Sequence, residues 1–250
     1  MYAIDNLPRF FPGVSFLQVI APVTPIISVI LVEFLGFTSL HRMWTKRGVL
    51  LTTMKDRAYQ HSLLYMSVGI TLEFAVLTRV YLPTSWIDNV GQLLATPWLS
   101  FIPAMVTYTT VIRIIAGITF LAIGLTLFGR SVMTFGLDYL MYLFLYFPNE
   151  SRVQQNAIYS VVRHPTYLSF IIICFGGALM WFSAYSFIFF AIVLIRWVYH
   201  IHFVEEKELV ERFGESYQQY RQSVPAFVVR PRFLGQFFRF LWGKGSSSEN

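Results

Sequence analysis

Long apolar runs separated by short polar stretches dominate the hydrophobic pattern of the chain. A helix needs about 20 mostly apolar residues to cross a bilayer, and on that basis the pattern predicts five spans. The predicted spans are Phe16–Phe37, Ser62–Leu82, Tyr108–Gly129, Tyr167–Phe182 and Tyr185–Phe203. Only Ser183 and Ala184 separate the last two spans, so we expect an antiparallel hairpin whose free ends lie side by side. The pattern therefore predicts an all-α integral membrane protein.

The amino-acid composition agrees with this fold class. Hydrophobic residues make up 56% of the 250 residues and charged residues only 13%, whereas soluble domains are about one quarter charged. Aromatic residues reach 18%, which fits a lipid-facing surface with interfacial belts. The single cysteine, Cys174, lies inside an apolar run, so the chain has no intrachain disulfide and no cysteine-rich metal site.

Basic residues concentrate in three regions: between spans one and two, between spans three and four, and after span five. These residues are Arg42, Lys46, Arg47, Lys55, Arg57, Arg130, Arg152, Arg163, Lys207, Arg212, Arg221, Arg230, Arg232, Arg239 and Lys244. The segment 83–107, on the opposite side, has no Lys or Arg. The positive-inside rule therefore predicts a cytosolic C-terminal part, in the endoplasmic reticulum of a eukaryote or the plasma membrane of a prokaryote.

The net charge of +6 fits a basic cytosolic face apposed to anionic lipid. No basic stretch stands out from the membrane pattern, so we expect no nucleic-acid partner.

Two helical segments are predicted after the last span. Glu205–Gln222 has a break near Gly214, and five of its residues share one face at helical spacing. These are Glu206, Leu209, Phe213, Tyr217 and Tyr220. Arg232–Trp242 predicts an interfacial amphipathic helix with Arg232 and Arg239 available to lipid headgroups. Its expected apolar stripe is Phe233, Leu234, Phe237, Phe238 and Leu241.

These features predict four regions. Residues 1–150 form three membrane helices and their connections, and 151–232 form a functional core. Residues 233–244 form the interfacial helix, and 245–250, with the sequence GSSSEN, are expected to be a tag remnant.

Polar residues gather at both free ends of the predicted hairpin. Arg163, His164 and Tyr167 precede or begin its first helix, and its second helix ends with Arg196, His200, His202, Glu205 and Glu206. The hairpin should bring a cationic group and an acidic pair together at the membrane surface. Ionisable residues at this depth indicate a functional site by default. A zwitterionic amino-acid moiety, such as the methionine end of S-adenosylmethionine, would suit this pattern of charges.

Structural roles are the alternative interpretation of each residue. Arg163 and Arg196 can snorkel to the interface, and Glu205 and Glu206 can be solvated residues favoured by the helix dipole. His200 and His202 lack a spaced third ligand, so we expect no metal. Within the spans, Glu33 and Glu73 should pair with polar groups on neighbouring helices, for which Arg113 is a candidate.

The chain from about Asn156 to Pro231 resembles the superfamily of isoprenylcysteine carboxyl methyltransferases and phospholipid methyltransferases. The resemblance rests on the order and spacing of four motifs that flank the apolar hairpin. They are RHPTY at Arg163–Tyr167, EEKEL at Glu205–Leu209, FGESYQQY at Phe213–Tyr220 and VPAFVVRP at Val224–Pro231. Within the superfamily, the chain is most similar to the isoprenylcysteine carboxyl methyltransferase branch.

The resemblance implies a membrane methyltransferase with S-adenosylmethionine as cofactor, S-adenosylhomocysteine as product and a lipid-accessible route for the acceptor. The acceptor expected first is the α-carboxylate of an isoprenylcysteine. The implied cofactor-binding residues are Tyr159, Val162, His164, Tyr167, Glu205, Glu206 and Pro225. Catalytic roles are expected for Arg163, Arg196, His202 and Glu206. His202 could accept a proton from a neutral amine or hydroxyl acceptor.

Three positions depart from the family pattern. Ser169 stands where members usually have glycine, Ile201 where an arginine is common, and Asn156-Ala157-Ile158-Tyr159 where a glycine commonly precedes the tyrosine. The sequence therefore leaves other functions open. These are methylation of a phospholipid or of a small amine, thiol or hydroxyl, an NADPH-dependent reaction like that of sterol reductases, and a non-catalytic scaffold.

Overall fold

The computed structural model describes residues 2–54, 57–81, 89–100, 102, 106–136 and 153–243. These residues form helices and connections, with no β-strand among them, which confirms the all-α prediction. Among the described residues, four stretches are long and apolar enough to cross a membrane, namely Ser15–Met43, Gln60–Tyr81, Val106–Thr134 and Ala184–Phe213. Pro165–Trp181 is a shorter apolar helix. Each of the five predicted spans thus coincides with an apolar helix, and the chain is an integral membrane protein.

Some predictions fall on residues that the structure does not describe. Lys55, Leu82, Arg152, Lys244 and the expected tag remnant at 245–250 lie outside the described ranges, as does part of the segment 83–107. The division into four regions stays a prediction.

The helices group into two compact units. Unit 1 comprises Met1–Leu121 and Cys174–Ile195, and unit 2 comprises Ala122–Ile173 and Arg196–Asn250. Helices α7 (Val106–Phe135), α9 (Pro165–Trp181) and α10 (Ala184–His200) contribute residues to both. The remaining helices of unit 1 are α1 (Tyr2–Asp5), α2 (Leu7–Phe10), α3 (Ser15–Ile20), α4 (Thr24–Met54), α5 (Ala58–Tyr81) and α6 (Asn89–Ala95).

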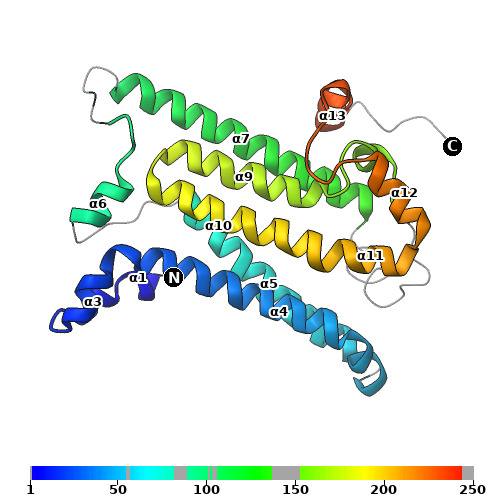
Figure 1. Cartoon of the computed structure of the whole chain (residues 1–250), viewed down its shortest axis with the longest axis horizontal. Coiled ribbons are helices and arrows are strands. Elements are labelled where there is room, and N and C mark those ends of the chain that lie inside the picture. Colours follow the sequence, from blue (N-terminus) through cyan, green and yellow to red (C-terminus); the bar gives the residue numbers. More distant parts are fainter. Residues whose placement is uncertain are drawn as a thin grey trace. The chain divides into compact units, whose positions relative to one another are not determined.

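The first two predicted spans form a pair of adjacent helices, α4 and α5 (Figure 1). Pro22 lies in a short 3₁₀ turn, Ala21–Val23, that joins α3 to α4. Pro25 lies in the first turn of α4, where a missing backbone N–H costs little. Helix α4 also continues to Met54, so Arg42, Lys46 and Arg47 lie on its last turns and not in a loop.

Two arginines of unit 1 make polar contacts that hold distant segments together. Arg79 pairs with Asp5 at 2.5 Å, and its guanidinium lies over the Phe189 ring. Arg113, the predicted candidate partner of Glu33 or Glu73, donates instead to the backbone carbonyl of Trp181 at 2.9 Å.

The predicted turn between the last two helices is confirmed. Helix α9 ends at Trp181, and Phe182 then adopts a positive φ of 49°. Ser183 caps α10, because its hydroxyl accepts the Ser186 N–H while the Ser186 hydroxyl accepts the Ser183 N–H. This reciprocal arrangement is a capping box built from two serines. The SAYS sequence therefore ends one helix and starts the next within two residues.

Unit 2 is built on the ends of the same helices and on the chain that follows α10. A 3₁₀ turn (Ala157–Ser160) leads into α9, and a π-helical turn (Ile201–Glu205) joins α10 to α11 (Glu206–Phe213). Then come α12 (Glu215–Ser223), a 3₁₀ turn (Pro231–Phe233) and α13 (Leu234–Leu241). The predicted break at Gly214 is present, at a φ of 57°. Of the predicted face across α11 and α12, Glu206, Leu209, Tyr217 and Tyr220 are buried and Phe213 is half-buried.

Most of unit 2's core lies between α7, the start of α9 and α13. Its buried residues are Leu127, Ile158, Tyr159, Val161, Val162, Leu168, Phe237 and Phe240. The residues of the predicted α13 stripe have different surroundings. Phe237 is buried, whereas Leu234 and Phe238 are exposed, because the core contacts only one side of the helix.

Candidate functional site

The segment before α9 is fixed by hydrogen bonds to chain more than fifty residues later. The Arg163 N–H donates to the Pro225 carbonyl at 2.9 Å, and the His164 N–H donates to the Ala226 carbonyl at 3.2 Å. The Tyr220 hydroxyl donates to the Tyr159 carbonyl at 2.6 Å. The RHP turn and the VPAF segment are therefore one paired structure, which explains why both motifs occur together.

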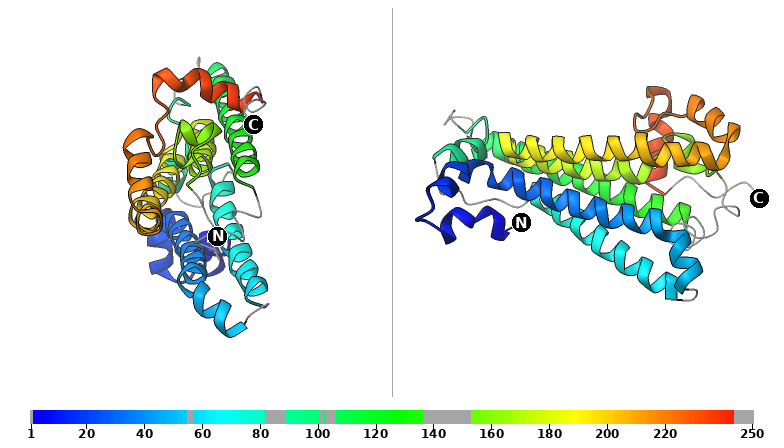
Figure 2. Two further views of the ribbon diagram at one scale, coloured as in Figure 1. Left: turned by 90° about the vertical axis from the view of Figure 1, so that its right-hand side faces the viewer. Right: turned by 60° about the horizontal axis from the view of Figure 1, so that its bottom comes forward.

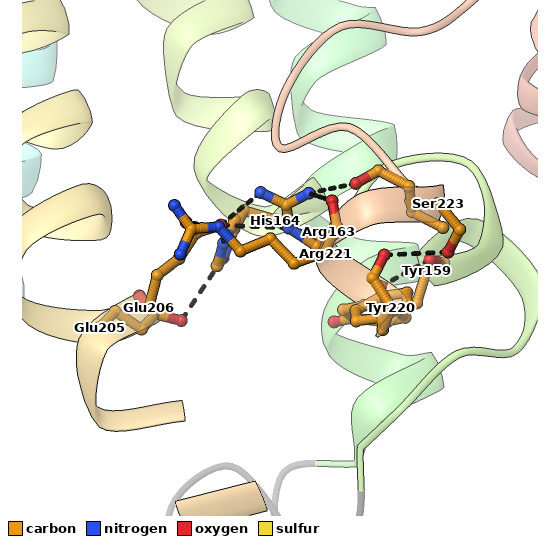
Figure 3. A network of polar contacts seen from close by, with 9 residues as sticks. Tyr159, Arg163, His164, Glu205, Glu206, Tyr220, Arg221 and Ser223 are labelled. Atoms are coloured by element: carbon orange, nitrogen blue, oxygen red, sulfur yellow. Dashed lines mark hydrogen bonds and ion pairs between the residues drawn. The ribbon is translucent and has the colours of Figure 1, made fainter. Parts of the chain in front are cut away.

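Arg163 connects three parts of this structure (Figure 3). Its Nε and Nη2 donate to Oε1 of Glu206, at 3.1 and 2.5 Å. Its Nη1 donates to the carbonyls of Arg221 and Val224. The guanidinium is planar and holds its N–H donors in a fixed geometry, which suits it to several simultaneous hydrogen bonds. Since these donors are engaged by the chain itself, Arg163 has the contacts of a positioning residue.

His164 lies between the two glutamates. Its Nε2 is 3.2 Å from Oε1 of Glu206, and its Nδ1 is 3.5 Å from Oε1 of Glu205. Burial opposes the charged imidazolium, but hydrogen bonds and the charges of both carboxylates outweigh it and raise the pKa of His164 above its ordinary value. The structure thus brings the predicted cationic turn and the acidic pair into direct contact.

The two glutamates sit where the helix changes its winding. Ile201–Glu205 is a π-helical turn, and Glu206 begins the following α-helix. Consecutive residues of an α-helix point about 100° apart, so one histidine would not ordinarily meet both. Single π-helical turns are rare and often lie at functional sites. Here the π-helical turn ends at Glu205, and the α-helix that follows it begins at Glu206, so the change of winding lies between the two acids that flank His164.

Aromatic rings line the neighbouring side of the cluster. The centre of the Tyr167 ring lies 4.9 Å from the centre of the Trp197 ring. It lies 5.9 Å from the ring centre of His164 and 6.2 Å from that of His200. Trp197 is also stacked on Phe170 at 5.5 Å. Tyr167, a predicted cofactor-binding residue, therefore lies between the charged groups and an aromatic wall.

The two acids differ in their remaining capacity to bind. Glu206 uses Oε1 for Arg163 and His164, and its Oε2 lies 3.3 Å from Nε of Arg221. Oε2 of Glu205 is buried and has no hydrogen-bond partner among the described residues. A buried carboxylate oxygen without a donor is energetically unfavourable. An ammonium group would satisfy it, so the donor set fits the amino-acid end of S-adenosylmethionine, with Glu205 as the contacting acid.

Two predicted catalytic residues, Arg196 and His202, have aromatic neighbours in the structure. The Arg196 guanidinium lies 3.9 Å from the centre of the adjacent Trp197 ring. His202 is exposed and packs edge-on against Phe203 at 4.8 Å. Among the described residues, no side chain of the acidic pair forms a hydrogen bond with His202. The catalytic roles of Arg196 and His202 stay predictions.

The other predicted cofactor-binding residues support the turn. Val162 and Tyr159 are buried in the core of unit 2, and the Pro225 carbonyl is engaged by Arg163. The departures from the family pattern also lie close by. Ser169 is buried, and its hydroxyl donates to the Thr166 carbonyl, while Ile201 is the buried first residue of the π-helical turn.

The sequence interpretation did not single out Arg221, Trp197 or Tyr220 as site residues. Arg221 contributes a second guanidinium to Glu206 and a backbone carbonyl to Arg163. Its position just after the tyrosine-rich motif was the available signal. Trp197 lies three residues before His200, so both lie on the same side of α10. Because the hairpin brings His200 close to Tyr167, this spacing could have indicated that Trp197 lies beside Tyr167 as well.

Comparison with known proteins points to the same region. The phospholipid methyltransferase family profile matches residues 112–216. A protein-S-isoprenylcysteine O-methyltransferase of Schizosaccharomyces pombe is 37% identical over 73 residues, covering 29% of this chain and 31% of its own. Protein-S-isoprenylcysteine O-methyltransferase B of Arabidopsis thaliana is 29% identical over 112 residues, covering 45% and 57% of the two chains.

A third relative has a different name. Methanethiol S-methyltransferase 1 of Bradyrhizobium diazoefficiens is 31% identical over 77 residues, covering 31% of this chain and 26% of its own. The matches thus span less than two thirds of each relative's length, and no solved structure matches. The family profile includes Arg163, His164, Glu205 and Glu206, as the motifs predict. Over these residues the chain is similar to the phospholipid methyltransferase family and to protein-S-isoprenylcysteine O-methyltransferases.

Proposed function

We propose that the chain is a membrane methyltransferase that uses S-adenosylmethionine to methylate a lipid-like acceptor, in the first place the α-carboxylate of an isoprenylcysteine. The observation that carries this proposal is Oε2 of Glu205, a buried oxygen beside His164 for which the described part of the chain supplies no hydrogen-bond donor. Two isoprenylcysteine O-methyltransferases among the relatives support the choice of acceptor.

The residues of the cluster divide between binding and support. Glu205 holds the ammonium of the cofactor, and Tyr167 and Trp197 provide the adjacent aromatic surface. Arg163 and Glu206 form the buried pair that holds the RHP turn against α11. When bound, S-adenosylmethionine supplies an activated methyl group, and the protein then mainly has to align the acceptor with it.

A carboxylate acceptor needs no general base because it is already ionised at neutral pH. This fits the geometry, since His164 is occupied by two carboxylates and His202 lies outside the cluster.

Following the positive-inside rule, we place the site on the cytosolic face of the membrane.

The test is methyl transfer by the full chain in lipid nanodiscs. S-Adenosylmethionine with a tritiated methyl group is supplied together with N-acetyl-farnesylcysteine, and the product is treated with base. We expect label that base releases as methanol, as a methyl ester requires. Absence of label in this acceptor and in total lipid extract would reject the proposal.

Cofactor binding is tested separately by thermal unfolding. A ligand that binds only the folded state stabilises it, so S-adenosylhomocysteine should raise the melting temperature and NADPH should not. Glu205→Gln should abolish this rise. Glu211→Gln is the matched control, because Glu211 is an exposed acid on helix α11, which directly follows Glu205. Stabilisation by NADPH alone would instead favour a reductase.

A small thiol is the second candidate acceptor. The relative that is named a methanethiol S-methyltransferase supports it. If a small thiol is the acceptor, the same preparation should label a short alkyl thiol and should not label the farnesylcysteine carboxylate.

A further inference from the structure

Helix α13 has two apolar faces, of which the protein covers only one. Phe237 and Phe240 are buried against the core of unit 2. On the other side, Leu234 is 43% exposed, Phe238 40% and Trp242 72%. These three residues follow one another at i, i+4 and i+8, so they form one ridge along the helix. A continuous apolar ridge of this kind marks an interaction surface.

The packing of α13 places this ridge at the level where α7 leaves the bilayer. Phe237 and Phe240 belong to the same core cluster as Leu127, and the Arg130 guanidinium lies 5.2 Å from the centre of the Phe240 ring. Leu127 and Arg130 belong to the last turns of the membrane-spanning stretch Val106–Thr134. An arginine one turn before the end of a span is expected to reach the headgroup region. Within unit 2, α13 runs across the direction of α7 (Figure 2, left), as a helix lying in the membrane plane would.

Charge identifies the partner of the ridge. Arg239 on α13 and Arg232 in the 3₁₀ turn just before it are both exposed. The stretch Pro231–Gly243 contains no Asp or Glu. An apolar ridge bordered by arginines, with a tryptophan at its end, has the properties of a helix that binds the interface of an anionic bilayer.

We propose that α13 docks on the anionic membrane surface. Leu234, Phe238 and Trp242 enter the boundary between headgroups and acyl chains, while Arg232 and Arg239 bind lipid phosphates. On its buried face, Phe237 and Phe240 share a core cluster with Ile158, Val161 and Val162, which directly precede Arg163. Gln236 also donates to the Ser160 hydroxyl at 3.0 Å. Docking of α13 therefore supports the turn that carries Arg163 and His164.

The depth of the ridge can be measured in the full chain without any enzyme assay. A nitroxide label is attached to Phe238→Cys in nanodiscs that contain phosphatidylcholine and phosphatidylglycerol. Collisions with oxygen, which concentrates in lipid, are compared with collisions with a water-soluble nickel chelate. The matched control is Gln218→Cys on α12, an exposed position away from the proposed surface. The unsubstituted chain, whose only cysteine is buried Cys174, controls for stray labelling.

We expect a higher ratio of oxygen to nickel collisions at position 238 than at position 218. The ratio should fall when the anionic lipid is omitted, or when Arg232→Gln and Arg239→Gln are combined. Each basic residue near an anionic surface adds about 1 kcal/mol to its attraction, roughly a fivefold effect on the docked population.

Two results would overturn the proposal. One is free access of the nickel chelate to position 238 in anionic nanodiscs. The other is a strongly immobilised label that neither reagent reaches, which would mean that a second protein chain covers the ridge. A failed methyl-transfer assay would leave this measurement unaffected, so the two proposals can fail independently.

Discussion

Arg163 donates two hydrogen bonds to Oε1 of Glu206, which lies 43 residues later in the chain. The side chains of both residues are nearly inaccessible, at 7% and 4% exposure. Glu206 is therefore already paired before any ligand binds, whereas Glu205 keeps a buried oxygen without a partner among the described residues. Two adjacent glutamates of one motif are thus expected to respond differently to mutation.

Glu206→Gln should lower stability strongly. Glutamine keeps the shape but removes the charge that compensates Arg163 and His164, and breaking a buried ion pair on one side costs about 3–5 kcal/mol. The melting temperature in detergent micelles should fall clearly, with or without cofactor. Glu205→Gln should change it much less while removing the response to S-adenosylhomocysteine. Equal melting temperatures for the two variants would contradict this division.

The pH dependence of stability should report His164. Its pKa is raised above its ordinary value of 6.5 in the folded protein, so the folded state binds the proton more tightly than the unfolded state. The stabilisation is fully present below the unfolded pKa, near 6.5, and is lost as the pH rises through the folded pKa. We therefore expect the melting temperature to decrease across that window.

His164→Gln isolates this contribution from that of other titrating groups, which include Glu205 and Glu206. Subtracting the variant's melting temperatures from those of the parent should leave a difference that shrinks as the pH rises. A difference that stays constant between pH 6 and pH 9 would show that His164 does not bind its proton more tightly on folding.

Long apolar runs were sufficient to predict the five apolar helices, but not the short helices α1, α2 and α6. Long apolar runs identify spans directly, and the Ser183–Ala184 separation forces a hairpin, so the approach of His164 to Glu206 followed from topology. The π-helical turn could not be predicted in this way. It shifts the winding by one residue, and no feature of IHFVE distinguishes it from a continuing α-helix.

Side-chain partners were less predictable than helices. Arg163 looked like a ligand-binding cation, because sequence alone did not show that Val224 and Arg221 would present carbonyls to it. For α13, helical spacing gave one broad apolar stripe. Which part of it faces the core depends on the position of Leu127 and Ile158, and that is a tertiary property.

Position 157 should prefer glycine. Ala157 adopts a φ of 53°, a left-handed conformation that costs a non-glycine residue about 1–2 kcal/mol. Glycine loses about 0.4–1 kcal/mol through greater freedom of the unfolded chain, so Ala157→Gly should be at least as stable as the parent. Ala157→Val should be less stable by more than about 1 kcal/mol, because branched side chains are rare in this region. Thermal unfolding of both variants checks this order, and a stable valine variant would contradict it.

Tyr220→Phe tests the hydrogen bond that anchors the chain just before the RHP turn. The Tyr220 hydroxyl donates to the Tyr159 carbonyl at 2.6 Å, and both residues are buried. Phenylalanine preserves the packing of the ring but leaves the carbonyl without its donor, at a cost of about 1–3 kcal/mol.

The expected result is a lower melting temperature together with weaker stabilisation by S-adenosylhomocysteine, because Tyr159 lies four residues before Arg163. Tyr199→Phe is the matched control, since Tyr199 is 55% exposed on α10 and its hydroxyl supports no part of the cluster. If Tyr220→Phe lowered the melting temperature while cofactor binding stayed at the parental level, the bond would serve folding alone. The paired motifs would then not need this bond to hold the site in its binding geometry.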